Sequence, residues 1–416
     1  MGEWRSSFWG DEVTLNYGKA IRGYQSATGG FRVYGSNGPI GWHDERLSDG
    51  PGVILGRKGA YRGVKFSPDP FFVIDTAYYV TPKGEMDMRW LYYAIKYHRL
   101  GEIDDGSPIP STTRAAVYAR DLDVPLLAEQ QAIANVLSAL DDKIELNRRM
   151  NATLEGMAQA IFRDWFVDFG PVRRAQAGAT DPVAILGGLT PDPARAAHFA
   201  ALFPAAFGDN GFPVGWSETA IGDLVQSVGG STPSTGDESL WSPGLHRWAT
   251  PKDLSGMNDL ALFDTGRQIS DAGLAKITSG LLPVGSVLLS SRAPIGYMAI
   301  AQVPVAINQG FIGLLPSAEI GSAFLYCWCK ANMDKITANA NGSTFQEISK
   351  KNFRPITSPV PPKRELIAAF GEIADPLFAR IVSAAQENRT LAETRDYLLP
   401  RLMSGAVRVM SQTEAA

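Results

Sequence analysis

One heptad pattern occurs twice in this chain, 237 residues apart. In each copy, mostly apolar residues recur at alternating spacings of four and three, beginning at Ile133 and at Phe370. This alternation puts them on one stripe of a helix, the seam of a coiled coil. The first copy comprises Ile133, Leu137, Leu140, Ile144, Asn147, Asn151, Leu154, Ala158, Ile161 and Trp165, and the second Phe370, Ala374, Leu377, Ile381, Ala384, Asn388, Leu391, Arg395, Leu398 and Leu402. We therefore predict two long helices that pair within one chain.

The segments before the two seams also repeat in order. Predicted strands at 52–56 and 71–75 correspond to 285–290 and 303–307, and a predicted helix at 90–97 corresponds to 324–332. The offset drifts from 234 residues in the strands to 237 in the seams, as expected when insertions and deletions lie in loops. Conserved order and spacing within one chain indicate an internal repeat.

The repeat predicts an α+β fold with two similar globular domains separated by an antiparallel pair of long coiled-coil helices. A pseudo-two-fold axis relating two copies of one helix requires that they run antiparallel, and we expect the globular domains at opposite ends of the helical rod. The first helix, from Leu127 to Phe166, has a length of about 60 Å. The predicted segments are a first domain at 1–124, a spacer helix at 125–169, a linker at 170–215 with one short helix near 194–203, a second domain at 216–360, a second spacer helix at 361–405 and a tail at 406–416.

Composition and motifs favour a binding protein over an enzyme. The formal net charge is −4, and the clearest basic cluster is Arg57, Lys58, Arg62 and Lys65. No phosphate-binding loop, dinucleotide fingerprint or amino-methyltransferase motif occurs, so we predict no catalytic residues and no cofactor. The only cysteines, Cys327 and Cys329, lack nearby metal-ligand partners, so we predict no metal site. No apolar run could cross a membrane and no secretory signal is present, so we expect a cytoplasmic protein.

The two helical segments resemble the conserved helices of type I restriction-modification specificity subunits. The resemblance rests on Pro125–Ala134, Leu140–Asn147, Ala158–Phe162 and Trp165–Phe169 in the first helix, and on Arg395–Leu402 with Ser404-Gly405 in the second. Tyr34–Gly38 and Gly342–Phe345 also resemble stretches of that family's target recognition domains. The match covers nearly the whole chain.

The resemblance implies a non-catalytic subunit that selects the DNA sequence for a methyltransferase and endonuclease complex. Each recognition domain would bind one half of an asymmetric bipartite target in double-stranded DNA. The helices would space the two domains and dock two modification subunits, which carry S-adenosylmethionine and methylate adenine. Restriction subunits would join through the complex.

The candidate DNA contacts are polar, basic and aromatic side chains in loops, the types that reach base edges and phosphates. In the first domain they are Tyr34, Ser36, Asn37, Arg57, Lys58, Tyr61, Arg62, Ser111, Thr112 and Arg114. In the second they are Lys252, Arg292, Asn308, Gln309, Ser343 and Thr344. Arg292 is the strongest single candidate, because it aligns with Lys58 after a strand in both halves. For each, an ordinary turn or exposed loop is the structural alternative.

Trp165, Phe166 and Phe169 crowd the end of the first helix and are candidate contacts to a modification subunit. The structural alternative is that they cap the coiled coil against a globular domain. Two other functional classes stay open: a tandem ligand-binding protein such as a two-domain lectin, and an enzyme with an unrecognised site. The first predicts aromatic-lined sugar sites, and the second predicts turnover by the purified chain alone.

Overall fold

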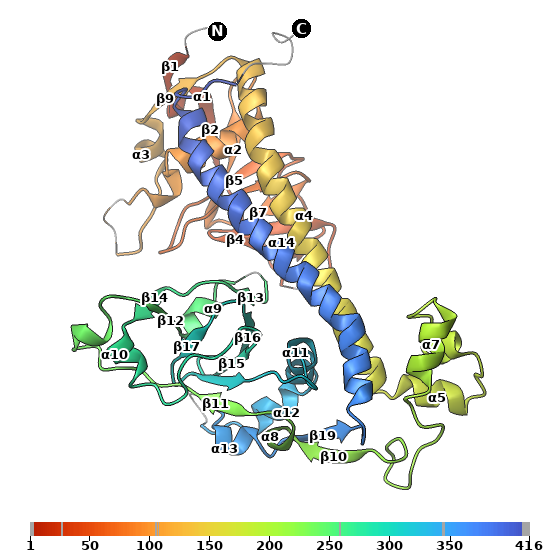
Figure 1. Cartoon of the computed structure of the whole chain (residues 1–416). Coiled ribbons are helices and arrows are strands. Elements are labelled where there is room, and N and C mark those ends of the chain that lie inside the picture. Colours follow the sequence, from red (N-terminus) through yellow and green to blue (C-terminus); the bar gives the residue numbers. More distant parts are fainter. Residues whose placement is uncertain are drawn as a thin grey trace. The chain divides into compact units, whose positions relative to one another are not determined.

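The computed structural model describes residues 4–25, 28–104, 106, 108–257, 259–342 and 346–409. The chain forms two compact units: Met1–Ile144 with Arg389–Ala416 in the first, and Glu145–Asn388 in the second. The long helices α4 (Leu127–Phe166) and α14 (Glu365–Met403) contribute residues to both units (Figure 1). Each unit therefore combines one globular domain with a part of each long helix.

The two long helices pair in an antiparallel direction within each unit. In the first unit Asp141 lies 2.6 Å from Arg395 of α14, and Glu129 lies 2.8 Å from Arg408, which follows the end of α14. Residue numbers thus rise along one helix as they fall along the other. In the second unit the amide of Asn147 donates to Asn388 at 3.0 Å, and the rings of Phe162 and Phe370 are 5.7 Å apart, so the same rule holds. The predicted bounds of α4, 127–166, and the antiparallel pairing are confirmed.

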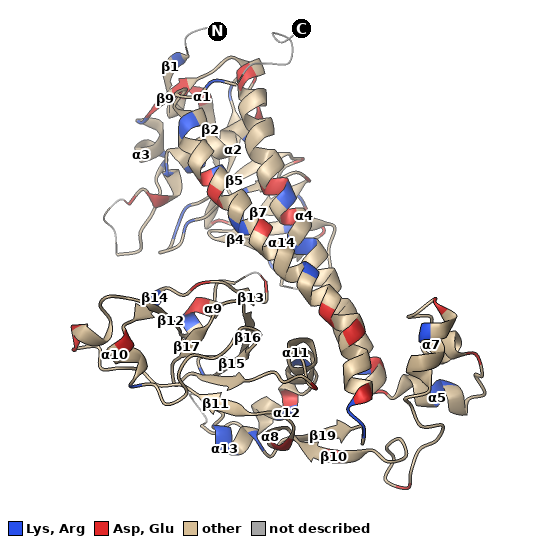
Figure 2. Ribbon diagram, in the orientation of Figure 1, with Lys and Arg blue, Asp and Glu red and all other residues tan. Residues whose placement is uncertain are grey.

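The predicted seam positions are buried or half-buried along both helices. Lys, Arg, Asp and Glu of both signs are distributed along the paired helices in Figure 2. The seam itself contains three buried asparagines, Asn147, Asn151 and Asn388. Polar side chains at seam positions cost stability but can specify register.

Among the described residues, the globular domain of the first unit contains three small sheets. Their strand orders are β2-β8-β5-β6, β4-β3-β7 and β1-β9. All neighbouring strands are antiparallel except β3 and β7, which are parallel. The strands are β1 (Arg5–Phe8), β2 (Val13–Tyr17), β3 (Phe31–Gly35), β4 (Gly38–His43), β5 (Gly52–Gly56), β6 (Val64–Ser67), β7 (Phe71–Val73), β8 (Ala77–Pro82) and β9 (Asp121–Val124).

The second unit repeats this arrangement, with one additional strand, β13, which pairs in parallel with β16. Its strand orders are β11-β18-β15-β16-β13, β14-β12-β17 and β10-β19. The strands are β10 (Ser217–Ala220), β11 (Ser227–Gly229), β12 (His246–Ala249), β13 (Ala261–Leu262), β14 (Arg267–Ile269), β15 (Val287–Ser291), β16 (Ile295–Ala301), β17 (Val305–Ile307), β18 (Phe311–Leu314) and β19 (Thr357–Val360). β12 and β17 are parallel, as are their counterparts β3 and β7.

The repeat extends to the register of individual residue pairs. Val53 pairs with Val80 in the first domain, and Val287 pairs with Leu314 in the second. Both partners are displaced by the same 234 residues. The internal repeat predicted from the sequence is therefore confirmed at the level of strand pairing.

Short helices and turns complete both units. In the first they are α1 (Trp9–Glu12), α2 (Met88–Tyr97), the 3₁₀ turn η1 (Leu100–Glu102) and α3 (Arg114–Tyr118). In the second they are α5 (Gly170–Gln176), α6 (Pro182–Ile185), α7 (Pro193–Ala200), α8 (Ile221–Leu224), η2 (Glu238–Leu240), α9 (Pro251–Leu254), α10 (Asp271–Leu274), α11 (Ser322–Ala331), α12 (Met333–Ala338) and α13 (Lys350–Phe353). The predicted helices 90–97 and 324–332 correspond to α2 and α11, each of which begins two residues earlier.

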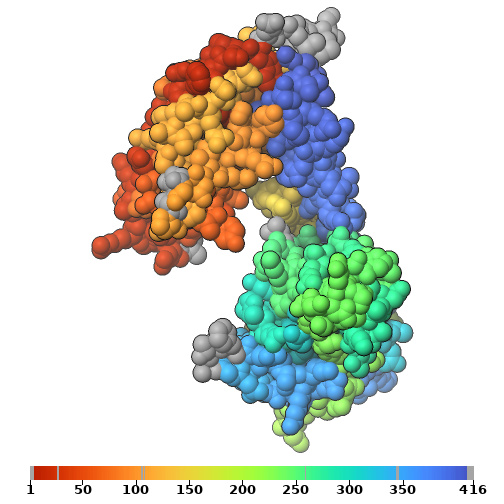
Figure 3. Space-filling view, turned by 90° about the vertical axis from the view of Figure 1, so that its left-hand side faces the viewer, coloured from red at the N-terminus to blue at the C-terminus, as the bar shows by residue number. Residues whose placement is uncertain are grey.

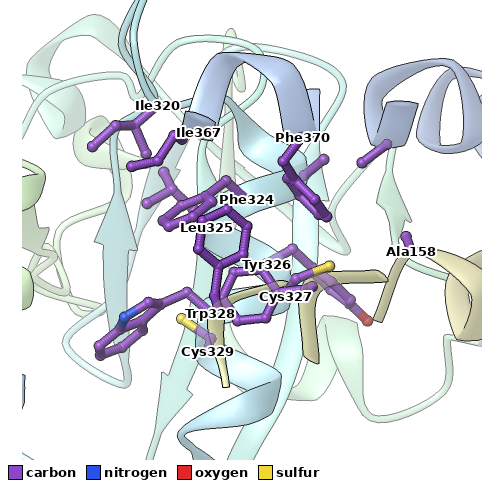
Figure 4. Packing of buried hydrophobic residues seen from close by; sticks show 14 of the residues in the cluster. Ala158, Ile320, Phe324, Leu325, Tyr326, Cys327, Trp328, Cys329, Ile367 and Phe370 are labelled. Atoms are coloured by element: carbon purple, nitrogen blue, oxygen red, sulfur yellow. The ribbon is translucent and has the colours of Figure 1, made fainter. Parts of the chain in front are cut away.

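The domain helices and the long helices share one hydrophobic core in each unit. In the first unit, α2 residues such as Trp90 and Leu91 are buried in one cluster with Ile133 and Leu137 of α4. The C-terminal part of α14, in dark blue, lies against the first domain in the space-filling view of Figure 3. In the second unit, Phe324 and Tyr326 of α11 are buried with Phe370 of α14 (Figure 4).

The segment predicted as a linker, 170–215, is part of the second unit. The expected short helix corresponds to α7, whereas α5 and α6 were not predicted. Phe199 and Phe203 contact the ring of Trp165, with centroids 6.1 and 5.2 Å away. Arg174 donates two hydrogen bonds to Asp164, at 3.0 and 2.7 Å. The segment therefore closes the hydrophobic end of α4.

Candidate nucleic-acid interface

Each domain is attached to α4 through a buried tyrosine and a carboxylate. The hydroxyl of Tyr93 on α2 donates to Asp141 at 2.7 Å, and that of Tyr326 on α11 donates to Glu155 at 2.9 Å. Burial, followed by the adjacent carboxylate, raises the pKa of both phenols, so both stay protonated and can donate. Arg89 adds an ion pair to Asp142 at 3.0 Å. These contacts orient the loops of each domain relative to the helix segment in its own unit.

Two arginines enclose a tyrosine in the first domain. The guanidinium carbons of Arg57 and Arg114 lie 4.8 and 4.0 Å from the ring centroid of Tyr17. Tyr17 is 46% exposed at the end of β2, and its ring lies 5.1 Å from that of Tyr78. Burial raises the pKa of Tyr78 to about 12, and the positive charge of the cluster comes from the two arginines. A cationic surface with an exposed aromatic face suits phosphates and bases.

Local hydrogen bonds explain why the arginines take these positions. The Nη1 of Arg57 donates to the carbonyl of Asp75 at 2.8 Å, and the Nε of Arg114 donates to the carbonyl of Leu15 at 2.7 Å. Each guanidinium thus uses one N–H donor in a hydrogen bond to the backbone, and both arginines are half-buried. Because Tyr17, Arg57 and Arg114 come from three distant segments, the sequence contains no local signal for this cluster.

Some predicted contacts belong to the packed interior of the first domain. Tyr34 is only 9% exposed and packs on Phe71, and Thr112 is fully buried. Arg62 donates to the carbonyls of Gly59, Gly101 and Ile103 at 2.7–2.9 Å. For these three residues the structural alternative accounts for the side chain, and a contact with DNA stays a prediction.

The remaining candidates of the first domain lie near the surface. Lys58, Asn37 and Tyr61 are exposed, and Tyr61 is 78% exposed. The half-buried hydroxyl of Ser36 contacts the carbonyls of Lys58 and Thr76, and Ser111 pairs with Lys58 in an isolated β-bridge. Ser36 and Ser111 therefore support the loop that contains Lys58 and Tyr61.

The second domain presents a smaller set of surface groups. Arg292 lies 3.6 Å from Glu347, so its charge is partly compensated. Lys252 and Gln309 are exposed, and Gln309 accepts a hydrogen bond from Thr232. Asn308 uses its Oδ1 to accept from the backbone of Gly310 at 2.9 Å. Ser343 and Thr344 lie outside the described residues.

The predicted partner contacts lie in the core of the second unit. Trp165, Phe166 and Phe169 are 0, 4 and 6% exposed. They pack with α7, α11, α14 and Trp216, for example at 6.1 Å between Trp165 and Phe199. This burial agrees with the alternative that the three residues cap the coiled coil against a globular domain. Their role in docking a modification subunit stays a prediction.

The described residues contain no group of three or more His, Cys, Asp and Glu side chains that could hold a metal ion. Cys327 and Cys329 are buried in α11, and burial raises the pKa of both thiols, that of Cys327 to about 12. In the same part of the chain, none of the helices combines the length and apolar character needed to span a bilayer.

Comparison with known proteins decides the family. A model of the type I restriction modification DNA specificity domain matches residues 22–156 and 213–388, which is most of the chain. The chain belongs to this family. The resemblance of the two helical segments is thereby confirmed. The chain is a DNA-specificity subunit of a type I restriction-modification system, and it is a recognition subunit rather than an enzyme.

Individual relatives agree with this assignment. The specificity subunit of the type I restriction enzyme HindI from Haemophilus influenzae is 29% identical over 339 residues, covering 72% of this chain and 71% of that protein. The MjaIX specificity subunit from Methanocaldococcus jannaschii is 34% identical over 155 residues, which cover 37% of this chain and 36% of that protein. The crystal structure of an S subunit from M. genitalium shares the fold with a TM-score of 0.57 at 18% identity, covering 96% of each chain.

Proposed function

We propose that each globular domain of this specificity subunit binds one half of an asymmetric, bipartite DNA target. The observation that carries the proposal is the shared strand register of two domains that differ in their surface loops. Equivalent positions hold Lys58 and Arg292, but the first is exposed and the second is paired with Glu347. One scaffold with two different sets of base and phosphate contacts would recognise two different half-sites.

The paired helices would set the distance between the half-sites. Domains that bind one face of the duplex favour half-sites about one helical turn, roughly 10 bp, apart. We therefore expect two short specific blocks separated by a few base pairs that the protein does not contact.

Two modification subunits would dock on the helices and supply the methyltransferase chemistry, and restriction subunits would join through them. The exposed face of α4 supports a docking role, because Leu146 and Met157 are 61 and 47% exposed and Met150 lies half-buried between them. These residues recur at i, i+4 and i+11 and so share one helix face. A partner helix would bury this apolar face.

The repeat provides a comparison for this face. The positions in α14 that correspond to Leu146, Met150 and Met157 are Ser383, Glu387 and Thr394, all polar. The double variant Leu146→Glu/Met157→Glu should abolish co-purification of the modification subunit that docks on α4. The matched double variant Ser383→Glu/Thr394→Glu should leave that modification subunit bound. If both double variants retain the modification subunit equally well, this face of α4 is not the docking surface.

Methylome sequencing tests the DNA-binding proposal. Cells that carry this subunit with its modification partner should methylate one asymmetric bipartite sequence. An exchange of residues 216–360 for the corresponding domain of a relative should change one block and leave the other intact. A single continuous motif, or a change in both blocks, would contradict it.

A further inference from the structure

Tyr61 is an aromatic side chain that the first domain holds away from its own core. It is 78% exposed, the largest value found for a big apolar or aromatic side chain among the described residues. It lies in the loop between β5 and β6, at 57–63. A single exposed aromatic side chain is common at protein surfaces and needs no functional explanation by itself. It is informative only where the loop that carries it is fixed in position.

The loop is fastened on both sides of Tyr61. On one side Lys58 pairs with Ser111, and the backbone N–H of Gly59 donates to the carbonyl of Pro110 at 3.0 Å. On the other side Arg62 donates three hydrogen bonds to backbone carbonyls, at 2.7–2.9 Å. Hydrogen bonds from a charged donor are stronger than neutral ones. The tip, Ala60 and Tyr61, projects from a fixed base.

The second domain uses the equivalent hairpin differently, although its length is the same. Leu55 pairs with Val64 in the first domain, and Leu289 pairs with Met298 in the second, nine residues apart in both. In the second domain the pairing continues to Ser291 and Ile295, so the hairpin closes with a shorter loop. Ile295, which occupies the position of Tyr61, is half-buried and packs against the core. The extended aromatic is therefore specific to the first domain.

Basic residues flank Tyr61 in the sequence. Lys58 and Lys65 are exposed, and Arg57 lies before them at the start of the loop. Exposed basic side chains close to Tyr61 in the sequence can neutralise phosphates of a bound duplex. An aromatic ring between phosphate contacts is the arrangement by which proteins stack on bases or insert a wedge into a base step.

We propose that the ring of Tyr61 contacts the bases of the first half-site, that this contact adds to the sequence preference there through the cost of unstacking the base step it enters, and that Arg62 is its positioning residue. The proposal rests on the DNA-binding function proposed above and adds a defined chemical role. The ring, and not the hydroxyl, makes the contact. The second half-site has no counterpart to it.

The test uses the complete chain in complex with its modification subunits and three DNA duplexes at one fixed salt concentration. The first duplex carries the methylated target sequence, and the others have one or the other block scrambled. Tyr61→Ala should weaken binding of the intact target about 5- to 150-fold, the range for loss of one base–aromatic contact. It should also reduce discrimination against scrambling of one block and leave discrimination against scrambling of the other block unchanged. Tyr61→Phe should behave as the wild type.

Two further variants separate positioning from folding. Arg62→Ala should reduce the same discrimination, whereas Phe8→Ala, which removes another exposed aromatic of the first unit, should not. Thermal unfolding of Tyr61→Ala should match the wild type. If Tyr61→Ala keeps full discrimination at both blocks, the role of Tyr61 is refuted while the bipartite function stands. If the wild-type complex does not distinguish the three duplexes, both proposals are wrong.

Discussion

Two asparagines one helical turn apart in the seam of α4 should respond oppositely to the same substitution. Asn147 and Asn151 are 1 and 4% exposed. The amide of Asn147 donates to Glu387 at 2.7 Å and to Asn388 at 3.0 Å. The amide of Asn151 makes one long contact, 3.4 Å to the carbonyl of Ile381, and its Oδ1 accepts no hydrogen bond from the described residues.

The repeat explains this difference. The counterpart of Asn151 in the second seam is Asn388, and that of Asn147 is Ala384. Asn388 therefore meets an asparagine across the antiparallel pair, whereas the symmetry-related partner of Asn151 is Ala384, which has no amide. Of the two symmetry-related positions in the seam, only the one with Asn147 and Asn388 has an amide–amide hydrogen bond.

Asn151→Leu should stabilise the second unit by about 1–2 kcal/mol, because it removes a buried acceptor whose unpaired state costs about 1–3 kcal/mol. Asn147→Leu should destabilise it by about 1–2 kcal/mol, because it leaves the buried Oδ1 of Asn388 without its partner. For a unit of this size each kcal/mol shifts Tm by about 2–4 °C. Scanning calorimetry of the full chain measures both shifts. Shifts of the same sign in both variants would refute the reasoning, since burial and helix propensity change alike in the two.

Three further outcomes are expected. The hydrogen bond from Arg5 holds the pKa of Glu12 below its ordinary value of 4.5, so its stabilising contribution is present above that value and is lost as pH falls through the lowered pKa; Glu12→Gln should lower Tm at pH 7 and leave it unchanged at pH 2, as measured by circular dichroism. Trp165→Ala should destabilise the second unit by about 3–5 kcal/mol, measured by urea unfolding, because it empties the space between α7 and α14; a loss below 1 kcal/mol would contradict this packing. Lys58→Ala should weaken binding of all DNA sequences alike and reduce the slope of log affinity against log salt by about 1, and a sequence-dependent loss would instead make Lys58 a base contact.

Features that depend on local periodicity were predictable. The seam spacing determined the extent of α4, the antiparallel pairing and the repeat, because two heptad stripes of equal length can bury their apolar positions against each other. The sequence of the 170–215 segment also contains capping signals for its helices. Asp181 and Asp192 each precede a proline and cap α6 and α7. The high Ala, Gly and Pro content of the 170–215 segment instead favours a linker.

Features that depend on contacts between distant segments were not predictable. Tyr34, Arg57, Arg62 and Thr112 all belong to residue types that suit DNA, yet the structure buries two of them and commits Arg62 to backbone carbonyls. Tyr17, which the sequence did not single out, lies between Arg57 and Arg114. Residue type predicts what a side chain can bind, but not whether its surface stays exposed.

The amino-acid sequence by itself therefore determined the repeated architecture and the family, since helix periodicity and segment order are properties of neighbours along the chain. Only the tertiary structure decided which loop residues face the solvent, because burial depends on segments far apart in sequence. The hairpins after β5 and β15 illustrate both points. Their equal length follows from the repeat, and the different fates of Tyr61 and Ile295 follow from how each hairpin closes.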